Sequence, residues 1–166
     1  MDKEEFLRLT LDSEPTLFHV SLSILHNEQD CADAVQEAIL KAYENRHKLK
    51  EIKYFKTWIV RIVINECYGM LRRKKHFQTY DDTVLNDFAN LSHYVREEYI
   101  DLYRAISRLN EKVKICVVLH YLEGYSVAET ANVLKIPIGT VKSRLNHARK
   151  ELKGLLGEQE VKYENV

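Results

Sequence analysis

Apolar residues recur at helical spacing along most of the chain. Between residues 30 and 43 they fall at positions i, i+3, i+4 and i+7, as in an amphipathic helix, and similar spacing returns at 16–25 and 96–109. The 166 residues include only two Pro and five Gly. Because an all-β fold needs a turn about every 8–12 residues, this scarcity favours long helices. We therefore predict an all-α fold.

The segment 57–75 is ambiguous by pattern. Its β-branched residues between Trp58 and Ile64 favour a buried strand by propensity. The segment contains no Pro, however, and its apolar residues cover one broad helical face. We predict a helix with Thr57 at its start. Gly69 in its interior costs about 1 kcal/mol relative to Ala, and we interpret it as the mark of either a close approach to another backbone or a local kink.

Residues 126–155 have the pattern of a helix–turn–helix. Ser126 and Glu129 form the S-x-x-E signature of a capping box, and a second helix is predicted at about 138–155. Lys135 lies near the turn position that often holds a Gly in the left-handed conformation. A residue other than Gly costs about 1 kcal/mol there. This geometry is typical of DNA-reading motifs. The second helix presents polar side chains that can reach base edges or phosphates: Thr140, Lys142, Ser143, Arg144, Asn146, His147 and Lys150.

The charge distribution is uneven although the net charge is zero. Residues 1–40 carry a net charge of −7 (2 basic, 9 acidic), residues 41–75 carry +8 (11 basic, 3 acidic) and residues 135–153 carry +5 (6 basic, 1 acidic). Two separated basic blocks indicate two separate contacts with a polyanion. Solvated helix faces balanced by nearby acids remain an alternative reading of the charges alone.

Residues 76–95 separate the two basic blocks. They show no sustained hydrophobic period and contain three Asp but no Lys or Arg. A stretch of about 20 residues is longer than a usual loop inside one core. We predict a flexible acidic linker that joins two small helical domains, residues 1–75 and 96–166.

Several functional classes find no support in the sequence. There is no uncharged apolar run of about 18 residues, and the acidic N-terminus does not resemble a secretory signal, so we expect a cytoplasmic protein. The three Cys are far apart without a CxxC pair, and we expect buried thiols rather than a metal site or disulfides. Neither a GxSxG motif nor a P-loop occurs. We expect no catalysis, no metal, no cofactor and no small-molecule substrate.

Three segments in order resemble the extracytoplasmic-function (ECF) sigma factors of bacterial RNA polymerase. Residues 30–43 resemble their region 2.2 helix, residues 55–65 with 71–75 resemble their promoter-melting helix, and residues 136–149 resemble their region 4 recognition helix. The resemblance implies a sigma region 2-like bundle followed by a region 4-like helix–turn–helix domain. The first would open and read the minus-ten promoter element as single-stranded DNA, and the second would read the minus-thirty-five element as duplex.

The residue types around the melting helix suit this role. Capture of a single strand needs cations for its backbone and polar or aromatic surfaces for its unstacked bases. Asn65 matches a polar position that the family uses for base contact. The expected minus-ten residues are Tyr54, Lys56, Arg61, Asn65, Arg72, Arg73, Lys74 and Lys75.

The resemblance also implies protein partners. The helix at residues 30–43 presents polar residues opposite Val35 and Ile39, and this face would dock on the core RNA polymerase: Asp33, Gln36, Glu37 and Lys41. Besides core polymerase and promoter DNA, the family implies an inhibitory anti-sigma factor, often anchored in the membrane.

A stand-alone helix–turn–helix regulator remains an alternative. Such a protein, with an N-terminal sensor or dimerisation domain, explains the C-terminal half equally well. It does not explain the basic helix at residues 55–75. A dimeric regulator should bind a palindromic duplex by itself, whereas a sigma factor needs polymerase.

Overall fold

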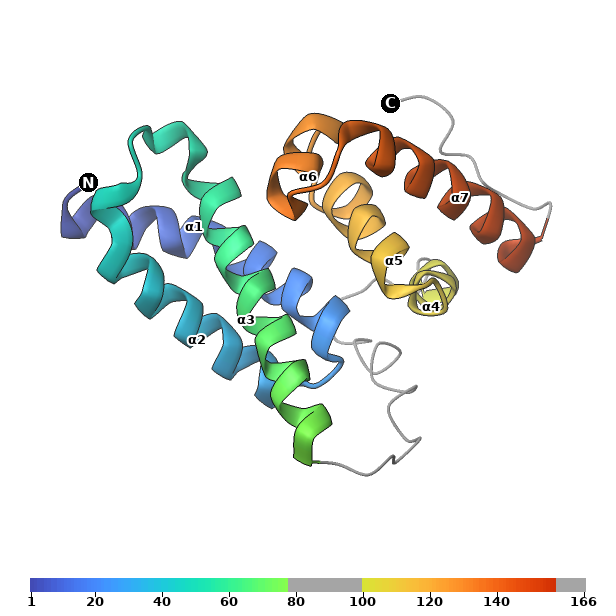
Figure 1. The fold of residues 1–166 in the computed structure, drawn as a ribbon, viewed down its shortest axis with the longest axis horizontal. Helices are drawn as coiled ribbons and strands as arrows, with labels where there is room; N and C mark the ends of the chain where they lie inside the picture. The colour runs from blue at the N-terminus through green and yellow to red at the C-terminus, as the bar shows by residue number, and fades with distance from the viewer. Residues whose placement is uncertain (78–99, 158–166) are drawn as a thin grey trace. The chain divides into compact units, whose positions relative to one another are not determined.

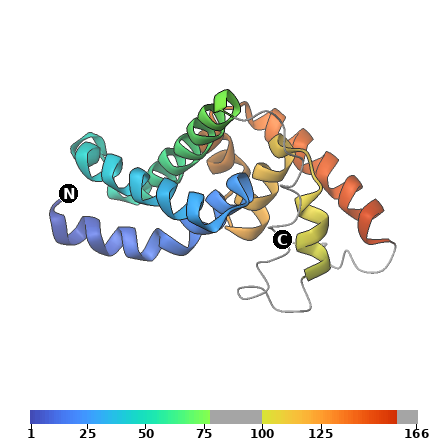
Figure 2. The ribbon, with the colours of Figure 1, turned by 90° about the horizontal axis from the view of Figure 1, so that it is seen from below.

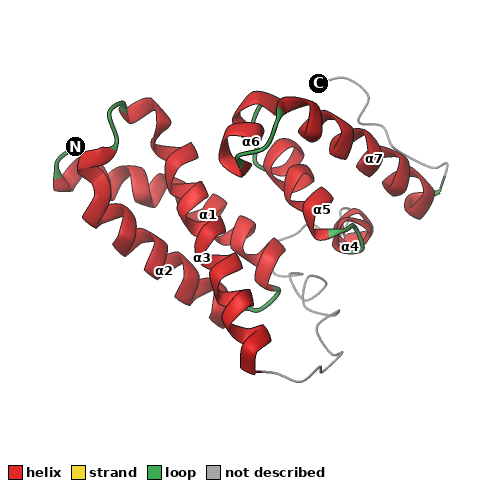
Figure 3. Ribbon diagram, viewed as in Figure 1, coloured by secondary structure: helices red, strands yellow, loops and turns green. Residues whose placement is uncertain are grey.

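The structure, a computed structural model, describes residues 1–77 and 100–157. Every regular element in these two ranges is helical (Figure 3), which confirms the all-α prediction. The chain divides into two compact units, Met1–Asp82 and Thr83–Val166. Residues 76 and 77 of the expected linker continue a helix, and its remainder lies outside the described residues.

The first unit is a bundle of three long helices. These are α1 (Lys3–Leu25), α2 (Glu28–Asn45) and α3 (Phe55–Phe77), which lie against one another in both views (Figures 1 and 2). Two short 3-10 turns, Arg46–Lys48 and Ile52–Tyr54, connect α2 to α3.

The helix starts follow local capping chemistry. The Asp2 carboxylate accepts a hydrogen bond from the Glu5 N–H at 2.8 Å, so α1 begins near the start of the chain and not at residue 16 as predicted. The Asn27 side chain similarly accepts from the Asp30 N–H at 2.9 Å at the start of α2. Each cap satisfies an amide that the helix itself leaves without a partner.

Aromatic packing joins the three helices of the first unit. The Phe6 ring of α1 meets the Tyr43 ring of α2 and the Phe55 ring of α3 edge-on, with centroids 5.3 and 5.6 Å apart. Such pairs contribute about 0.5–1.5 kcal/mol beyond the area that they bury. Ile59 and Val63 are fully buried on one face of α3. Burial of this face explains why the β-branched segment is a helix despite its strand propensity.

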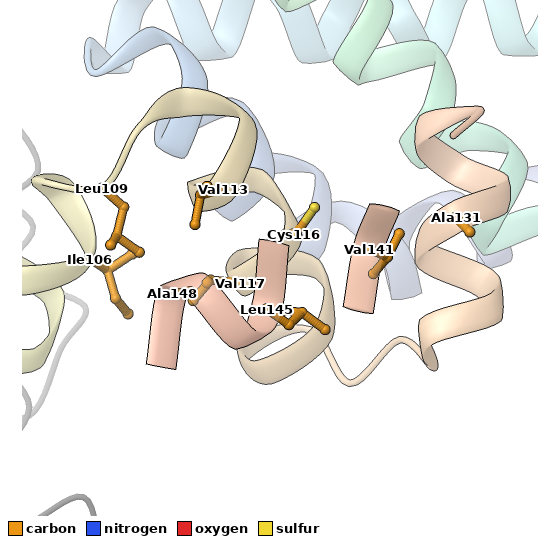
Figure 4. Packing of buried hydrophobic residues seen from close by; sticks show 9 residues of the cluster. All are labelled: Ile106, Leu109, Val113, Cys116, Val117, Ala131, Val141, Leu145 and Ala148. Carbon is orange, nitrogen blue, oxygen red and sulfur yellow. The ribbon is translucent and has the colours of Figure 1, made fainter. Parts of the chain in front are cut away.

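The second unit packs its helices around one apolar cluster. Its elements are α4 (Ile100–Ser107), α5 (Glu111–Val117) with a π-helical turn at Val118–Leu122, α6 (Val127–Leu134) and α7 (Ile138–Leu156). Side chains from all four helices and the turn after α4 converge in the cluster (Figure 4): Ile106, Leu109, Val113, Cys116, Val117, Ala131, Val141, Leu145 and Ala148.

The helix–turn–helix signals predicted from sequence are confirmed. Both hydrogen bonds of the capping box form, from the Glu129 N–H to the Ser126 hydroxyl at 3.1 Å and from the Ser126 N–H to the Glu129 carboxylate at 2.8 Å. Lys135 adopts the left-handed conformation, with φ of 54°, and ends α6. The Ile136 N–H then donates to the Ala131 carbonyl at 3.1 Å, which closes the turn before α7.

Candidate nucleic-acid interface

Helix α3 separates an apolar face from a polar one. Ile59, Val63 and Cys67 lie four residues apart and are fully buried, which fixes the rotation of the helix in the bundle. The predicted minus-ten residues are exposed except Arg61, which is half-buried. The exposed set comprises Tyr54, Lys56, Asn65, Arg72, Arg73, Lys74 and Lys75.

Ion pairs connect α3 to α2. The Lys74 ammonium binds the Asp30 carboxylate, and the Lys41 Nζ lies 2.8 Å from Glu66 Oε2. Lys41 also lies 3.3 Å from Glu37 on its own helix. The hydrogen bond to Glu66 raises the pKa of Lys41, so its ammonium form is favoured. These contacts give two of the predicted site residues, Lys41 and Lys74, an additional role in holding α3 against α2.

The predicted polymerase-binding face of α2 is largely exposed. Asp33, Gln36 and Glu37 are exposed, and Lys41 is half-buried beside them. Leu40 lies on the same surface with 53% of its area exposed, and the sequence reasoning did not select it. A large apolar side chain amid polar neighbours is the signal that would have identified it.

An open groove of about 510 Å³ lies between α2 and α3. Trp58 and Ile62 of α3 form its apolar side, and four residues of the other wall are polar: Lys41, Glu44, Asn45 and Lys48. The Trp58 ring is half-buried and lies 5.9 Å from the Phe55 ring. The groove thus places an aromatic surface next to cationic side chains on the same unit.

Helix α7 is anchored by three buried residues. Val141, Leu145 and Ala148 face the core of the second unit, which turns the opposite side of the helix outward. Five predicted minus-thirty-five residues are exposed, whereas Thr140 and Arg144 are half-buried. The exposed five are Lys142, Ser143, Asn146, His147 and Lys150.

Several polar side chains of α7 have internal partners. The Ser143 hydroxyl donates to the Thr140 carbonyl at 3.1 Å, and His147 Nε2 lies 3.3 Å from the Glu151 carboxylate. Arg144 Nη1 donates to the Lys112 carbonyl of α5 at 3.4 Å. Arg144 therefore bridges two helices, a role that the sequence pattern did not predict.

Arg149 is a further cation of α7 that the sequence analysis did not select. Its Nη1 donates to the Tyr121 hydroxyl at 2.6 Å, and both side chains are exposed. The Tyr121 ring in turn packs edge-on against His120, with centroids 4.8 Å apart. The basic composition of residues 135–153 includes Arg149, but its orientation depends on the π-helical turn after α5 and is not visible in the sequence.

The three cysteines are buried and free, as predicted. Burial raises the pKa of the Cys67 thiol to about 12 and also raises the pKa of Cys31 and Cys116. A thiol with a raised pKa is a poor nucleophile at neutral pH. Within the described ranges, no group of three or more His, Cys, Asp or Glu side chains is arranged to hold a metal ion.

Comparison with known families accounts for both units. The family Sigma-70 region 2 matches residues 11–77, and the family Sigma-70, region 4 matches residues 99–152. The first match contains the whole of α3, and the second covers α7 as far as residue 152. Among the helices in residues 1–77 and 100–157, none is long and apolar enough to cross a membrane.

Solved structures with the same fold include two protein complexes. The sigma factor RpoE of Bartonella quintana, crystallised with the anti-sigma factor NepR, superposes with a TM-score of 0.76 at 22% identity, covering 95% of this chain and 100% of RpoE. CnrH, solved with the cytosolic domain of CnrY, superposes with a TM-score of 0.69 at 22% identity, covering 93% of this chain and 89% of CnrH. At this identity the likeness concerns the fold.

Sequence relatives are more specific. The ECF RNA polymerase sigma factor SigM of Mycobacterium tuberculosis is 36% identical over 129 residues, which cover 78% of this chain and 65% of SigM, slightly less than two thirds of its length. SigW of Bacillus subtilis, also an ECF sigma factor, is 27% identical over 92% of this chain and 89% of its own. The sigma factor HrpL of Pseudomonas syringae is 30% identical over 88% of this chain and 84% of its own. With both sigma-70 regions matched in order, the chain belongs to the ECF group of RNA polymerase sigma factors.

Proposed function

We propose that this chain binds core RNA polymerase and directs promoter-specific initiation of transcription. The domain formed by residues 1–75 would read and open the minus-ten element, the domain formed by residues 96–166 would read the minus-thirty-five element, and residues 76–95 would link them. One observation carries the proposal: each sigma-70 region contains one helix, α3 or α7, that buries an apolar face and exposes a basic one. Catalysis of RNA synthesis would belong to the core polymerase.

Minus-ten recognition would use the exposed side of α3. Asn65 offers an amide for a base edge, and Tyr54 offers an exposed ring on which an unstacked base can stack. The cations of α3 and Lys56 at its start would contact the strand backbone, and the half-buried Arg61 would support the same surface. Tyr54 lies with the Lys53 ammonium 4.8 Å from its ring centroid, which adds positive charge beside the stacking surface.

Minus-thirty-five recognition would use the outward side of α7. Lys142, Ser143 and Asn146 carry groups that can bond to base edges in a major groove. His147 and Lys150 lie one turn further along the exposed surface. Thr140 and Arg144, which are half-buried, would set the position of the helix as much as they contact DNA.

Polymerase docking would use the exposed face of α2. Asp33, Gln36, Glu37 and Lys41 supply polar contacts, and Leu40 supplies an apolar centre of the kind that anchors interfaces. An anti-sigma factor would control access to such surfaces, a proposal supported by the RpoE complex with NepR. Because core polymerase and promoter DNA are cytoplasmic in bacteria, the function implies a cytoplasmic location.

Reconstituted transcription tests the proposal. Purified core polymerase would transcribe a genomic fragment library with and without the chain, and start sites would be mapped by sequencing. We expect new, specific starts that depend on the chain, preceded by two common elements. Failure to bind polymerase, together with tight binding of the purified chain to a palindromic duplex, would instead identify a stand-alone helix–turn–helix regulator.

A further inference from the structure

Contacts inside the first unit do not explain why residue 69 is a glycine. Helix α3 runs without interruption from Phe55 to Phe77, so Gly69 does not mark a break. Its φ is not positive, and a Cβ added there would meet none of the backbone of α1 or α2 within 4 Å. Within the described residues, no close approach of another backbone therefore explains the glycine, and the helix does not end there. A glycine inside a helix nevertheless lowers its stability relative to alanine.

The neighbours of Gly69 are the candidate DNA-binding residues. Asn65, Gly69, Arg72 and Arg73 lie at i, i+4, i+7 and i+8, which places them on one side of α3. A Cβ at Gly69 would lie 3.5 Å from Arg73 Nη1 and 3.7 Å from Arg72 Nη2. Two guanidinium groups thus converge on the space directly above the bare backbone of Gly69.

This convergence lacks a counter-charge within the described ranges. Arg72 and Arg73 are exposed, and neither forms an ion pair with a residue in 1–77 or 100–157. The adjacent Lys74 differs because Asp30 neutralises it. Two like charges that approach the same point repel each other unless an anion lies between them.

We propose that Arg72, Arg73 and the backbone of Gly69 form a seat for one phosphodiester group of single-stranded DNA. Guanidinium groups bind phosphate oxygens through paired N–H donors, and two of them can hold one phosphate from both sides. The absent side chain leaves room for that phosphate against the helix. Asn65 lies one turn before the seat, so the phosphate would hold the strand where the Asn65 amide reaches a base. The identification of the strand as promoter DNA rests on the proposed function.

The substitution Gly69→Ala distinguishes an effect on DNA binding from an effect on the stability of the helix. The added methyl group fits, because 3.5 and 3.7 Å are ordinary contact distances to flexible side chains. Gly69→Ala should therefore raise the Tm of the first unit by a few degrees, yet weaken binding of fluorescein-labelled oligothymidylate about tenfold. Gly154→Ala is the matched control, because this glycine also lies inside a helix, α7, but has no atom within 4 Å of its Cβ position. It should leave oligothymidylate binding unchanged.

Three further measurements identify the phosphate as the ligand. Fluorescence anisotropy at a series of KCl concentrations gives the slope of the logarithm of the binding constant against the logarithm of the salt concentration. The magnitude of this salt slope should be about 0.7 smaller for Gly69→Ala and for Arg72→Ala, because each variant loses one single-strand phosphate contact. Gly69→Asp should weaken binding more than Gly69→Ala, because its carboxylate would pair with both guanidinium groups. On a methylphosphonate oligothymidylate, which lacks backbone charge, Gly69→Ala should bind as well as the unchanged chain.

The opposite results overturn the seat. The proposal is wrong if the unchanged chain and Gly69→Ala bind with equal affinity and equal salt slope. It is also wrong if Gly69→Ala loses as much affinity for the methylphosphonate strand as for oligothymidylate, or if the unchanged chain does not bind oligothymidylate. Transcription with core polymerase distinguishes this failure from failure of the proposed function. If the unchanged chain and Gly69→Ala direct the same specific starts equally well, the seat alone is wrong, whereas no specific starts with either chain contradicts the sigma-factor function itself.

Discussion

The two basic helices, α3 and α7, hold their cations in different ways. In α3, charges pair across the interface with α2, since Lys74 binds Asp30 and Glu66 binds Lys41. In α7, two arginines instead donate to neutral oxygens, the Lys112 carbonyl and the Tyr121 hydroxyl. Asp30 of α2 therefore offsets part of the positive charge of α3, whereas Arg144 and Arg149 of α7 are oriented without being neutralised.

This difference suits the two proposed targets. A single strand is flexible and is held mainly through its charged backbone, so the amount of free positive charge on α3 sets the affinity. A duplex is rigid and is read by side chains in fixed positions. Contacts that orient cations and leave their charge intact favour such reading. Substitutions that act on one surface alone test whether the two surfaces are separate.

The largest expected effect tests the independence of the two units. Leu145→Ala removes a buried side chain from the cluster of the second unit and should lower its free energy of unfolding by about 2–5 kcal/mol. Hydrogen exchange should then show faster opening of α6 and α7, with α1 to α3 unchanged. Val63→Ala, in the core of the first unit, should give the reverse pattern. Equal loss of protection in both units from either substitution would show that they unfold as one.

The next largest effect separates the two DNA elements. Asn65→Ala should impair the reading or opening of the minus-ten element. The loss should show as reduced transcription from promoters with an altered minus-thirty-five element, and duplex binding by α7 should stay intact. Lys142→Ala should weaken recognition of the minus-thirty-five duplex and leave minus-ten opening intact. Each loss should be about 1–3 kcal/mol, the usual value of one specific contact. Loss of core polymerase binding in Asn65→Ala, measured by native gel electrophoresis, would contradict the assignment of α3.

Arg144→Ala sharpens the same comparison within α7. Because Arg144 also bridges α7 to α5, its loss should weaken duplex recognition and lower the free energy of unfolding by about 1 kcal/mol. Lys142→Ala, which removes an exposed side chain, should leave stability unchanged in the same urea titration. Equal stability of the two variants would mean that the Arg144 bridge contributes nothing.

A smaller effect concerns the counter-charge on α3. Asp30→Asn releases Lys74 and should increase the affinity for oligothymidylate a few-fold, with a salt slope about 0.7 larger. Asp33→Asn is the control, because it removes an exposed acid of the same helix that has no ion pair with α3. If both substitutions raise the affinity equally, general repulsion by α2, and not the Asp30 contact, restrains the site.

Local chemistry made much of the fold predictable. The capping box at Ser126, the left-handed turn at Lys135 and the apolar stripe of α7 depend on neighbouring residues and were predicted correctly. Helix α1 was predicted only from residue 16, although it begins at Lys3 and contains Pro15. A proline removes one backbone donor, but buried residues on both sides keep α1 continuous.

Contacts between helices could not be predicted in the same way. The Lys74–Asp30 pair joins residues 44 positions apart, and it exists because α2 and α3 pack in one particular register. The pattern of cations on α3 predicted a DNA-binding surface but not which cations are already paired. Likewise, the sequence singled out Gly69 but could not show that the space beside it holds two guanidinium groups.

The last comparison concerns the two left-handed helix ends, one in each unit. His26 ends α1 with φ of 56°, and Lys135 ends α6 with φ of 54°. Glycine adopts this conformation without strain, so Lys135→Gly should raise the free energy of unfolding of the second unit by about 1 kcal/mol. His26→Gly should raise that of the first unit by a similar amount, because its backbone has nearly the same conformation. Urea titration followed by hydrogen exchange in each unit would measure both. Unequal gains would show that backbone strain alone does not set the stability of these two helix ends.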